Sequence, residues 1–301
     1  MSFAIALVIL LGLPVKAFAL DNTIVSSDLS EYKTFSNEYD YLLMLQNCTQ
    51  EELAELGMKE EDVENLEESF YKAIEERAAL SVEELLGFGY TQEEISILKA
   101  YSNGARVSGS EIRSLAAVLT ASIKLNNCGT KTATFRYEWS WDHAPFMALE
   151  DSAAMRWIAY DKNGYELDVT KTVEEVKINY YLGDVRRATF SGTQEPNLEF
   201  NSINVQFSEN ILVGSDNGPT TAYGKDGSIK ITVKVEDSVD NEINYIKVAA
   251  LYGHTLIGAN APSISLSPTG SISISFSGNT KIDKLGGHKV KIGVGSTIED
   301  I

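Results

Sequence analysis

The spacing of hydrophobic residues changes once along the chain, near residues 126–129. Before that point apolar residues recur at intervals of three and four, as on one face of an α-helix. After it they alternate with polar residues, as in a β-strand. The pattern predicts an α+β protein divided by domain. We expect an N-terminal all-α helical-hairpin module over 36–126 and an antiparallel β-sandwich over 130–296, with a linker at 20–35 and a tail at 297–301.

The helical module contains an internal repeat, in which residues 49–66 align without a gap on residues 81–98, at an offset of 32. Each unit opens with Ser or Thr followed three residues later by Glu, the capping-box spacing that satisfies free amides at a helix N-terminus. A glycine, Gly57 or Gly89, then ends the short helix, because glycine tolerates the left-handed conformation found there. Each unit is therefore predicted to be a helical hairpin. The two capping pairs are Thr49–Glu52 and Ser81–Glu84.

Further helices are predicted around the repeat, giving five to seven between residues 36 and 126. One covers 37–46, and another continues the first unit through Leu66, Phe70 and Ile74. The clearest amphipathic helix is opened by a capping box at Ser108 and Glu111, and its apolar positions are Ile112, Leu115, Ala116, Leu119 and Ile123. Packing and capping explain these positions, and a peptide-binding groove between the two hairpins is the functional alternative.

The second half shows short alternating segments separated by turn sequences. Strands are expected at 176–182, 203–207, 229–235, 245–251, 272–276 and 290–294, among nine to eleven in all. Asn163-Gly164, Asn217-Gly218 and Asp226-Gly227 are predicted turns. Many short antiparallel strands with one polar face are typical of a β-sandwich.

One strand, over 135–141, carries an aromatic side chain at every second position. Such a row of rings either fills a core or forms a platform on which a sugar stacks. Core packing is the more common use of such a row. If the platform exists, its ligand-binding residues are Tyr137, Trp139, Trp141, Asp142 and His143.

The same segment resembles uncharacterised secreted β-domain proteins of Gram-positive, spore-forming bacteria. The resemblance rests on the pair Trp139-x-Trp141, the nearby Pro145 and Asp151, and a following strand that ends in Trp157. It extends to the later serine-rich strands. It implies a bacterial secreted β domain and brings no activity with it.

The N-terminus is typical of an export signal. An apolar run from Phe3 to Leu13 precedes Pro14 and the small-x-small sequence at 17–19, although no Lys or Arg precedes the run. The run is shorter than the roughly 20 residues that a membrane-spanning helix needs. We therefore expect a signal peptide at 1–19, an extracellular protein and no stable membrane insertion after cleavage. A buried N-terminal strand or helix is the alternative.

The net charge of −18 is concentrated near the start, where residues 21–80 carry 16 acidic and 4 basic side chains. An acidic surface repels phosphate backbones, so nucleic acid is not expected as a partner. A protein or a glycan at the cell surface is the expected partner. A solvated acidic face without a partner also explains the charge.

The two cysteines, Cys48 and Cys128, stand at either end of the predicted helical module. A disulfide between them would close a long loop and stabilise the fold by about 4–5 kcal/mol on a loop-entropy estimate. Two unpaired thiols are the alternative.

Candidate catalytic chemistry is sparse. The three histidines are scattered, and no nucleophile motif or histidine-pair metal spacing occurs in the sequence. The oxygen-bearing residues around Asn163 lack a calcium-loop pattern and fit a hairpin turn better. We therefore expect no catalytic residue, metal or cofactor. The sequence favours an exported, non-catalytic binding or surface-associated protein, with a secreted glycan-directed hydrolase or a structural envelope or spore-layer protein as alternatives.

Overall fold

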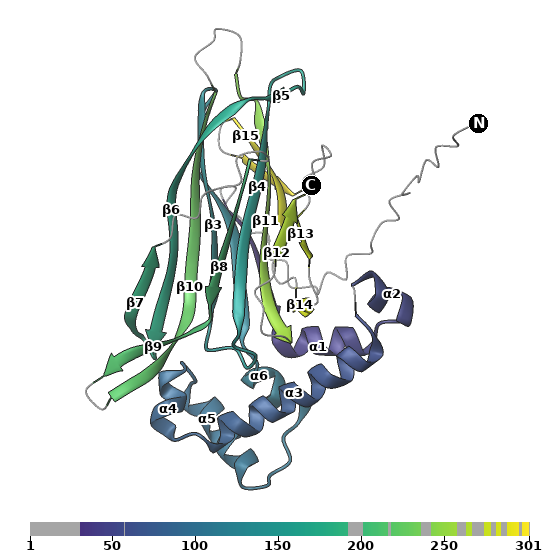
Figure 1. Cartoon of the computed structure of the whole chain (residues 1–301), viewed down its shortest axis with the longest axis vertical. Helices are drawn as coiled ribbons and strands as arrows, with labels where there is room; N and C mark the ends of the chain where they lie inside the picture. Colours follow the sequence, from purple (N-terminus) through teal and green to yellow (C-terminus); the bar gives the residue numbers. More distant parts are fainter. Residues whose placement is uncertain are drawn as a thin grey trace, which may run out of the picture.

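The computed structural model describes residues 31–56, 58–191, 201–215, 218–235, 242–257, 263–266, 274–277, 281–283, 288–294 and 297–300. Within these ranges both helices and antiparallel sheets are present, so the predicted α+β class is confirmed. The long strands run side by side, and the helices gather at one end of them (Figure 1). The predicted signal peptide at 1–19 lies outside the described residues.

Six described helices occupy residues 38–115. They are α1 (Glu38–Gln46), α2 (Gln50–Glu55), α3 (Glu60–Ala79), α4 (Val82–Gly87), α5 (Gln92–Ser102) and α6 (Gly109–Leu115). The capping boxes at Thr49 and Ser81 form as predicted, and Gly89 follows α4 with a left-handed φ of +87°. The helices share a hydrophobic core of their own, which includes Leu45, Phe70, Ile74, Leu85 and Leu98.

None of the described helices combines the length and the apolar character needed to cross a membrane.

The first sheet has the strand order β1-β2-β3-β10-β6-β7, with β9 paired to β10. Its strands are β1 (Glu31–Asn37), β2 (Val118–Cys128), β3 (Thr132–Trp141), β6 (Val169–Leu182), β7 (Val185–Ser191), β9 (Asn210–Ser215) and β10 (Gly218–Val235). The order places β1, which precedes all the helices, beside β2, which follows them. The helical part is therefore inserted between two neighbouring strands of one sheet.

The second sheet has the order β16-β15-β11-β4-β5, with β14 on β11 and β8 on β4. Its strands are β4 (Glu150–Tyr160), β5 (Glu166–Leu167), β8 (Ser202–Ser208), β11 (Tyr245–Ile257), β14 (Lys281–Asp283), β15 (His288–Gly293) and β16 (Thr297–Asp300). The strands β12 (Ser263–Leu266) and β13 (Ile274–Ser277) pair antiparallel in a separate two-stranded sheet.

The inward residues of both sheets form one hydrophobic core, because alternate residues of each strand point to the same side. Trp139 of β3 lies opposite Gly227 of β10, where a methyl group built on the glycine would come within 2.2 Å of the indole. Asp226-Gly227, predicted as a turn, is therefore interior strand in β10. The glycine there makes room for the indole ring.

The helix predicted through Leu119 and Ile123 is wrong beyond Leu115. Helix α6 ends at that residue, and β2 begins at Val118. Residues four apart lie on one face of a helix but also on one face of a strand, so the spacing fits both structures. The odd-numbered residues from Ala117 to Leu125 are all buried, and of the even-numbered residues between them only Ser122 is, which is strand periodicity.

Two flanking predictions also need correction. The linker expected over 20–35 contains the start of β1 at Glu31. The tail expected at 297–301 contains β16, which pairs with β15. Both segments are too short for their alternation to stand out in the sequence.

Candidate functional site

The aromatic row lies inside the sheet core. Tyr137, Trp139 and Trp141 have exposed fractions of 0%, 2% and 1%. The Trp139 ring stacks on Phe207 at 5.8 Å between centroids, and Trp141 Nε1 donates to the Tyr252 hydroxyl at 3.2 Å. This burial corrects the interpretation of the row as a sugar-binding platform, because a sugar cannot reach rings that are shielded from solvent.

Asp142 and His143 directly follow β3, at the junction with the helices. The His143 imidazole is buried against Tyr90 at 4.5 Å, Nδ1 lies 3.0 Å from Asp142 Oδ1, and Nε2 donates to the Leu115 carbonyl at 2.9 Å. Asp142 Oδ1 also accepts from the Val118 amide at 2.8 Å. Through these hydrogen bonds the pair connects the end of α6 and the start of β2 to the end of β3. Its role in the described contacts is structural.

The ionisation of this pair follows from its contacts. Burial opposes the charged imidazolium, but the hydrogen bond and charge of Asp142 outweigh it and raise the pKa of His143 above its usual value. Burial also opposes the Asp142 carboxylate, but His143 and two backbone amides lower the pKa of that carboxyl overall.

Cys48 and Cys128 are both free thiols. Cys48 packs against the helical core and Cys128 belongs to the sheet core. The bridge considered from the sequence does not form, because the two residues lie in separate hydrophobic cores.

A second cluster, not predicted from the sequence, gathers ionisable side chains between the sheets and α1. We call Asp151 of β4, Glu209 between β8 and β9, and His254 of β11 the buried triad. Their exposed fractions are 0%, 1% and 0%. One ligand atom from each lies within 4.8 Å of the others. Glu38, the first residue of α1, adjoins the triad and is also buried.

His254 stands at the centre of the buried triad. Its Nδ1 lies 3.2 Å from the Asp151 carboxylate oxygens and 3.4 Å from Glu209 Oε1. Its Nε2 lies 3.5 Å from Glu38 Oε1. The ring therefore faces carboxylates on both sides.

Backbone amides hold these carboxylates in place. Asp151 accepts from the Thr255 amide at 3.0 Å and from the Tyr252 hydroxyl, and Glu209 Oε2 accepts from the Leu149 amide at 3.2 Å. Glu38 accepts from the amides of Ala117 at 3.1 Å and Phe146 at 3.1 Å. Two atoms, Glu209 Oε1 and His254 Nε2, have no hydrogen-bond partner.

Burial and mutual charge set the ionisation of the buried triad. Burial and the charge of Asp151 raise the pKa of Glu209 well above its usual value. Burial alone would lower the pKa of His254, but Glu209 and Asp151 raise it. Burial alone would raise the pKa of Asp151, but His254 lowers it. Without another cation, a shared proton must relieve the excess negative charge.

The sequence held a partial signal for this cluster. Asp151 is in phase with the inward residues Met155 and Trp157, and His254 is in phase with Val248 and Tyr252. A titratable residue on the inward face of a strand is unusual. The register that aligns β4 with β11, and the turn that supplies Glu209, were not visible in the sequence.

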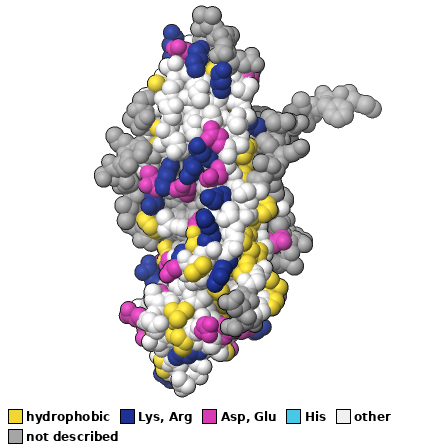
Figure 2. Space-filling model, turned by 90° about the vertical axis from the view of Figure 1, so that its left-hand side faces the viewer, with side chains coloured by type: hydrophobic (Ala, Val, Ile, Leu, Met, Phe, Trp, Pro, Cys, Tyr) yellow, Lys and Arg dark blue, Asp and Glu magenta, His cyan; other side chains and the backbone are white. Residues whose placement is uncertain are grey.

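The outer face of the first sheet carries mixed charge. Figure 2 shows Lys or Arg side chains next to Asp or Glu side chains along the side of β6 and β7. The pairs include Lys124–Glu138 at 2.6 Å, Arg136–Glu138 at 3.0 Å and Lys230–Glu174 at 2.5 Å. Because these opposite charges pair with one another, the described residues of this face present mixed charge to a ligand.

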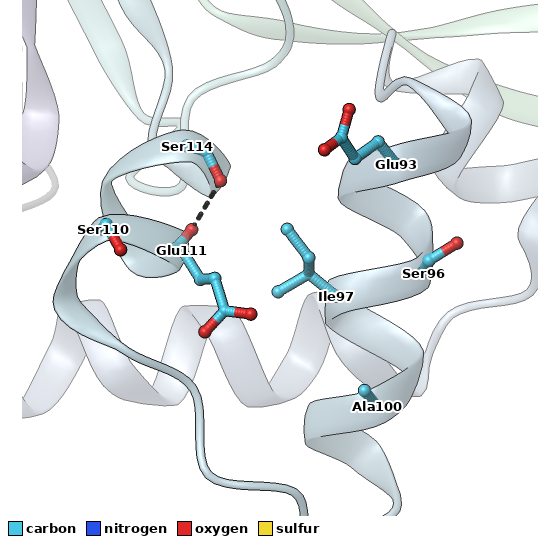
Figure 3. A pocket seen from close by; sticks show the side chains of 7 residues that line it. All are labelled: Glu93, Ser96, Ile97, Ala100, Ser110, Glu111 and Ser114. Carbon is cyan, nitrogen blue, oxygen red and sulfur yellow. Dashed lines mark hydrogen bonds between the residues drawn. The ribbon is translucent and has the colours of Figure 1, made fainter.

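A groove opens between α5 and α6, as Figure 3 shows. Its volume is about 410 Å³, and its lining residues are Glu93, Ser96, Ile97, Ala100, Ser110, Glu111 and Ser114. Ile97 and Ala100 form an apolar strip, while Glu93 and Glu111 supply carboxylates from the two helices. We call this feature the α5–α6 groove. A second hollow of about 370 Å³ shares Ser110 and Ser114 with it and includes Arg113 and Asp142.

Comparisons with known proteins do not identify a family. No protein-family model matches the chain, and no curated protein matches it. The solved structure described as "AvmM Catalyzes Macrocyclization in Alchivemycin A Biosynthesis" aligns with a TM-score of 0.23 and 8% identity. The alignment covers 55% of this chain and 89% of that one. A likeness at this level carries no argument about function.

Proposed function

We propose that the protein is an exported, non-catalytic binding protein that recognises a protein segment through the α5–α6 groove. The observation that carries the proposal is the groove itself, an open apolar strip flanked by carboxylates on the acidic helical part. A groove between the two predicted hairpins was the alternative to simple packing, and the proposed site lies instead between α5 and α6.

The proposal includes an architecture. We infer that the two facing sheets form a β-sandwich and that α2 with α3 and α4 with α5 are two helical hairpins mounted at its end. The common sheet core and the separate helical core support this inference. The sandwich would then serve as a rigid support for the helices.

The chemistry of the groove selects its partner. Ile97 and Ala100 suit one apolar side chain, and Glu93 and Glu111 suit Lys or Arg on either side of it. The Glu111 carboxylate also accepts hydrogen bonds from Ser108, which lower its pKa and keep it charged. A basic segment with an apolar anchor is therefore the expected ligand.

Non-catalytic use agrees with where the polar groups lie. The buried triad, the most concentrated set of ionisable side chains described, is sealed from solvent. The rings that favoured a glycan-directed hydrolase are in the core. Export rests on the signal-like N-terminus and on the resemblance to secreted β-domain proteins. N-terminal sequencing of the mature chain checks it, with cleavage after Ala19 expected and an intact N-terminus contradicting it.

Fluorescence anisotropy with labelled peptides tests the binding proposal. We expect the full chain to bind peptides with one large apolar residue between Lys or Arg residues, and not the same peptides with Asp in the flanking positions. Ile97→Lys should weaken binding by about tenfold or more, equal to about 1.4 kcal/mol. Binding should also weaken as salt rises.

The matched control is Leu56→Lys, which places the same charge on an exposed apolar residue outside the groove. This variant should bind as the wild-type chain does. Equal binding by the Ile97→Lys variant, or no preference for basic flanks, would refute the proposed site.

A further inference from the structure

The buried triad contains a buried polar atom that accepts no hydrogen bond. Glu209 Oε1, on the Nδ1 side of the His254 ring, is shielded from water, yet it accepts no hydrogen bond from an N–H or O–H group. An unpaired buried polar atom is costly, so such an atom usually marks an interaction with a group not yet considered. Glu209 Oε1 points at the same nitrogen, His254 Nδ1, as the Asp151 carboxylate does.

The spacing of the three ligand atoms fits a small cation. A tetrahedral ion with bonds of about 2.0–2.1 Å holds its ligand atoms about 3.3–3.4 Å apart. His254 Nδ1 lies 3.2 Å from Asp151 Oδ1 and 3.4 Å from Glu209 Oε1. All three ligand atoms lie within 4.8 Å of one another, so one ion can contact the three residues once the two carboxylates adjust around it.

The other side of the imidazole supports the same assignment. A metal-bound His usually donates its second ring N–H to a carboxylate, which fixes the ring and its tautomer. His254 Nε2 faces Glu38 Oε1 at 3.5 Å, and backbone amides hold Glu38. Glu38 is thus placed to orient the ligand histidine without binding the ion.

We propose that Asp151, Glu209 and His254 bind one divalent transition-metal ion of the Zn²⁺ class, with Glu38 as the positioning residue for His254. One nitrogen with carboxylate oxygens suits such ions better than Mg²⁺ or Ca²⁺, which take oxygen ligands, or Cu⁺, which prefers sulfur. The positive charge offsets the three buried carboxylates.

The site would have a structural role. Its ligands come from β4, β11 and the turn between β8 and β9, and Glu38 extends the contact to α1. A bound ion would join the helical part to the second sheet. Because the ligands are sealed, we expect the ion to enter as the chain folds and to exchange slowly afterwards.

The test uses the full chain, unfolded in urea with EDTA, freed of both, and refolded with Zn²⁺ or Co²⁺. We expect one ion per chain by elemental analysis, a higher melting temperature than the metal-free chain, and the visible absorption of tetrahedral Co²⁺. Glu209→Gln and His254→Gln should each lower the affinity by more than tenfold. Glu38→Gln should keep the stoichiometry and weaken binding by about tenfold.

Glu138→Gln is the control, since it removes a carboxylate from the outer face of the first sheet, away from the triad. It should bind metal as the wild-type chain does. Refolding without stoichiometric uptake, or equal uptake by the triad variants, would overturn the proposal. If a triad variant fails to fold, the wild-type Co²⁺ spectrum decides, because weak octahedral absorption indicates only surface carboxylates and contradicts the site.

Discussion

At the residue scale, buried charge is concentrated where the helices meet the sheets. Among the residues that the structure describes, every buried ionisable side chain except Arg156 lies at this junction. They are Glu38, Arg77, His143, Asp151, Glu209 and His254. Each has hydrogen bonds or charged neighbours that offset the loss of water. The junction is therefore sensitive to protonation as well as to packing.

The stabilising effect of His143 should depend on pH. Burial opposes its charged form, but Asp142 and, more weakly, Glu94 raise its pKa above the usual value of about 6.5. The protonated ring then stabilises the fold fully below about pH 6.5, and this contribution is lost as pH rises through the folded-state pKa. The loss of unfolding free energy caused by His143→Gln should be largest at low pH and shrink as pH rises.

Urea unfolding at a series of pH values measures this difference. Comparing variant with wild type at each pH cancels the titration of groups elsewhere, such as Glu174 on the outer face. A loss that stays constant from pH 5 to pH 9 would show that His143 stabilises the fold only as a neutral ring.

At the element scale, α3 is tied to the sheets by one buried cation. Arg77 donates from Nη2 to the Pro145 carbonyl at 2.9 Å, and its guanidinium lies 3.9 Å from the centre of the Phe88 ring. Arg77 continues the three-and-four spacing of the predicted apolar stripe through Leu66, Phe70 and Ile74, and it is buried with them. Its contacts join α3 to the loop after β3 and to the end of α4.

Arg77→Ala should lower the free energy of unfolding by about 2–4 kcal/mol, because it removes a charged hydrogen bond and leaves a buried carbonyl unpaired. Chemical denaturation measures the change. Arg113→Ala is the matched control, since Arg113 pairs with Asp40 while its own side chain is 53% exposed. The Asp40 side chain is 11% exposed, but the guanidinium is open to solvent, and a surface pair of this kind contributes about 1 kcal/mol or less. Equal losses in the two variants would contradict the role given to Arg77.

Local signals predicted several elements because neighbouring residues decide them. The capping boxes at Thr49, Ser81 and Ser108 each form, since Ser or Thr and a Glu three residues later bond the same turn. The strands around Ile229 and Ile178 follow from alternation alone. In these segments, the residues that decide the local structure are close to one another both along the chain and in space.

Prediction failed where the partner lies far along the chain. Leu119 and Ile123 fit helix and strand spacing equally, and pairing of β2 with β1 and β3 decides for the strand. The buried triad needs three separate segments in register. Only the topology of the second sheet brings them together.

At the scale of the whole molecule, the two hydrophobic cores should unfold together. The helical core includes Phe146 from the loop after β3, and Glu38 of α1 accepts the Phe146 amide. The helices also enter and leave through two paired strands, β1 and β2. Opening either part therefore breaks contacts of the other.

The three tryptophans make this prediction easy to check, because Trp139, Trp141 and Trp157 all belong to the sheet core. Tryptophan fluorescence then reports on the sheets, and the helical circular dichroism signal reports on the helical part. We expect the two denaturation curves to coincide. A helical transition well separated from the fluorescence transition would show that the helices are an independent unit.

The contact between Glu38 and His254 has a consequence for biosynthesis. More than two hundred residues separate the two side chains, so Glu38 cannot complete its contacts until the chain through β11 has been made. Proteins rich in such distant contacts fold slowly and leave apolar surface uncovered meanwhile. The junction between the first helix and the second sheet is therefore expected to form only after the last third of the chain has been synthesised.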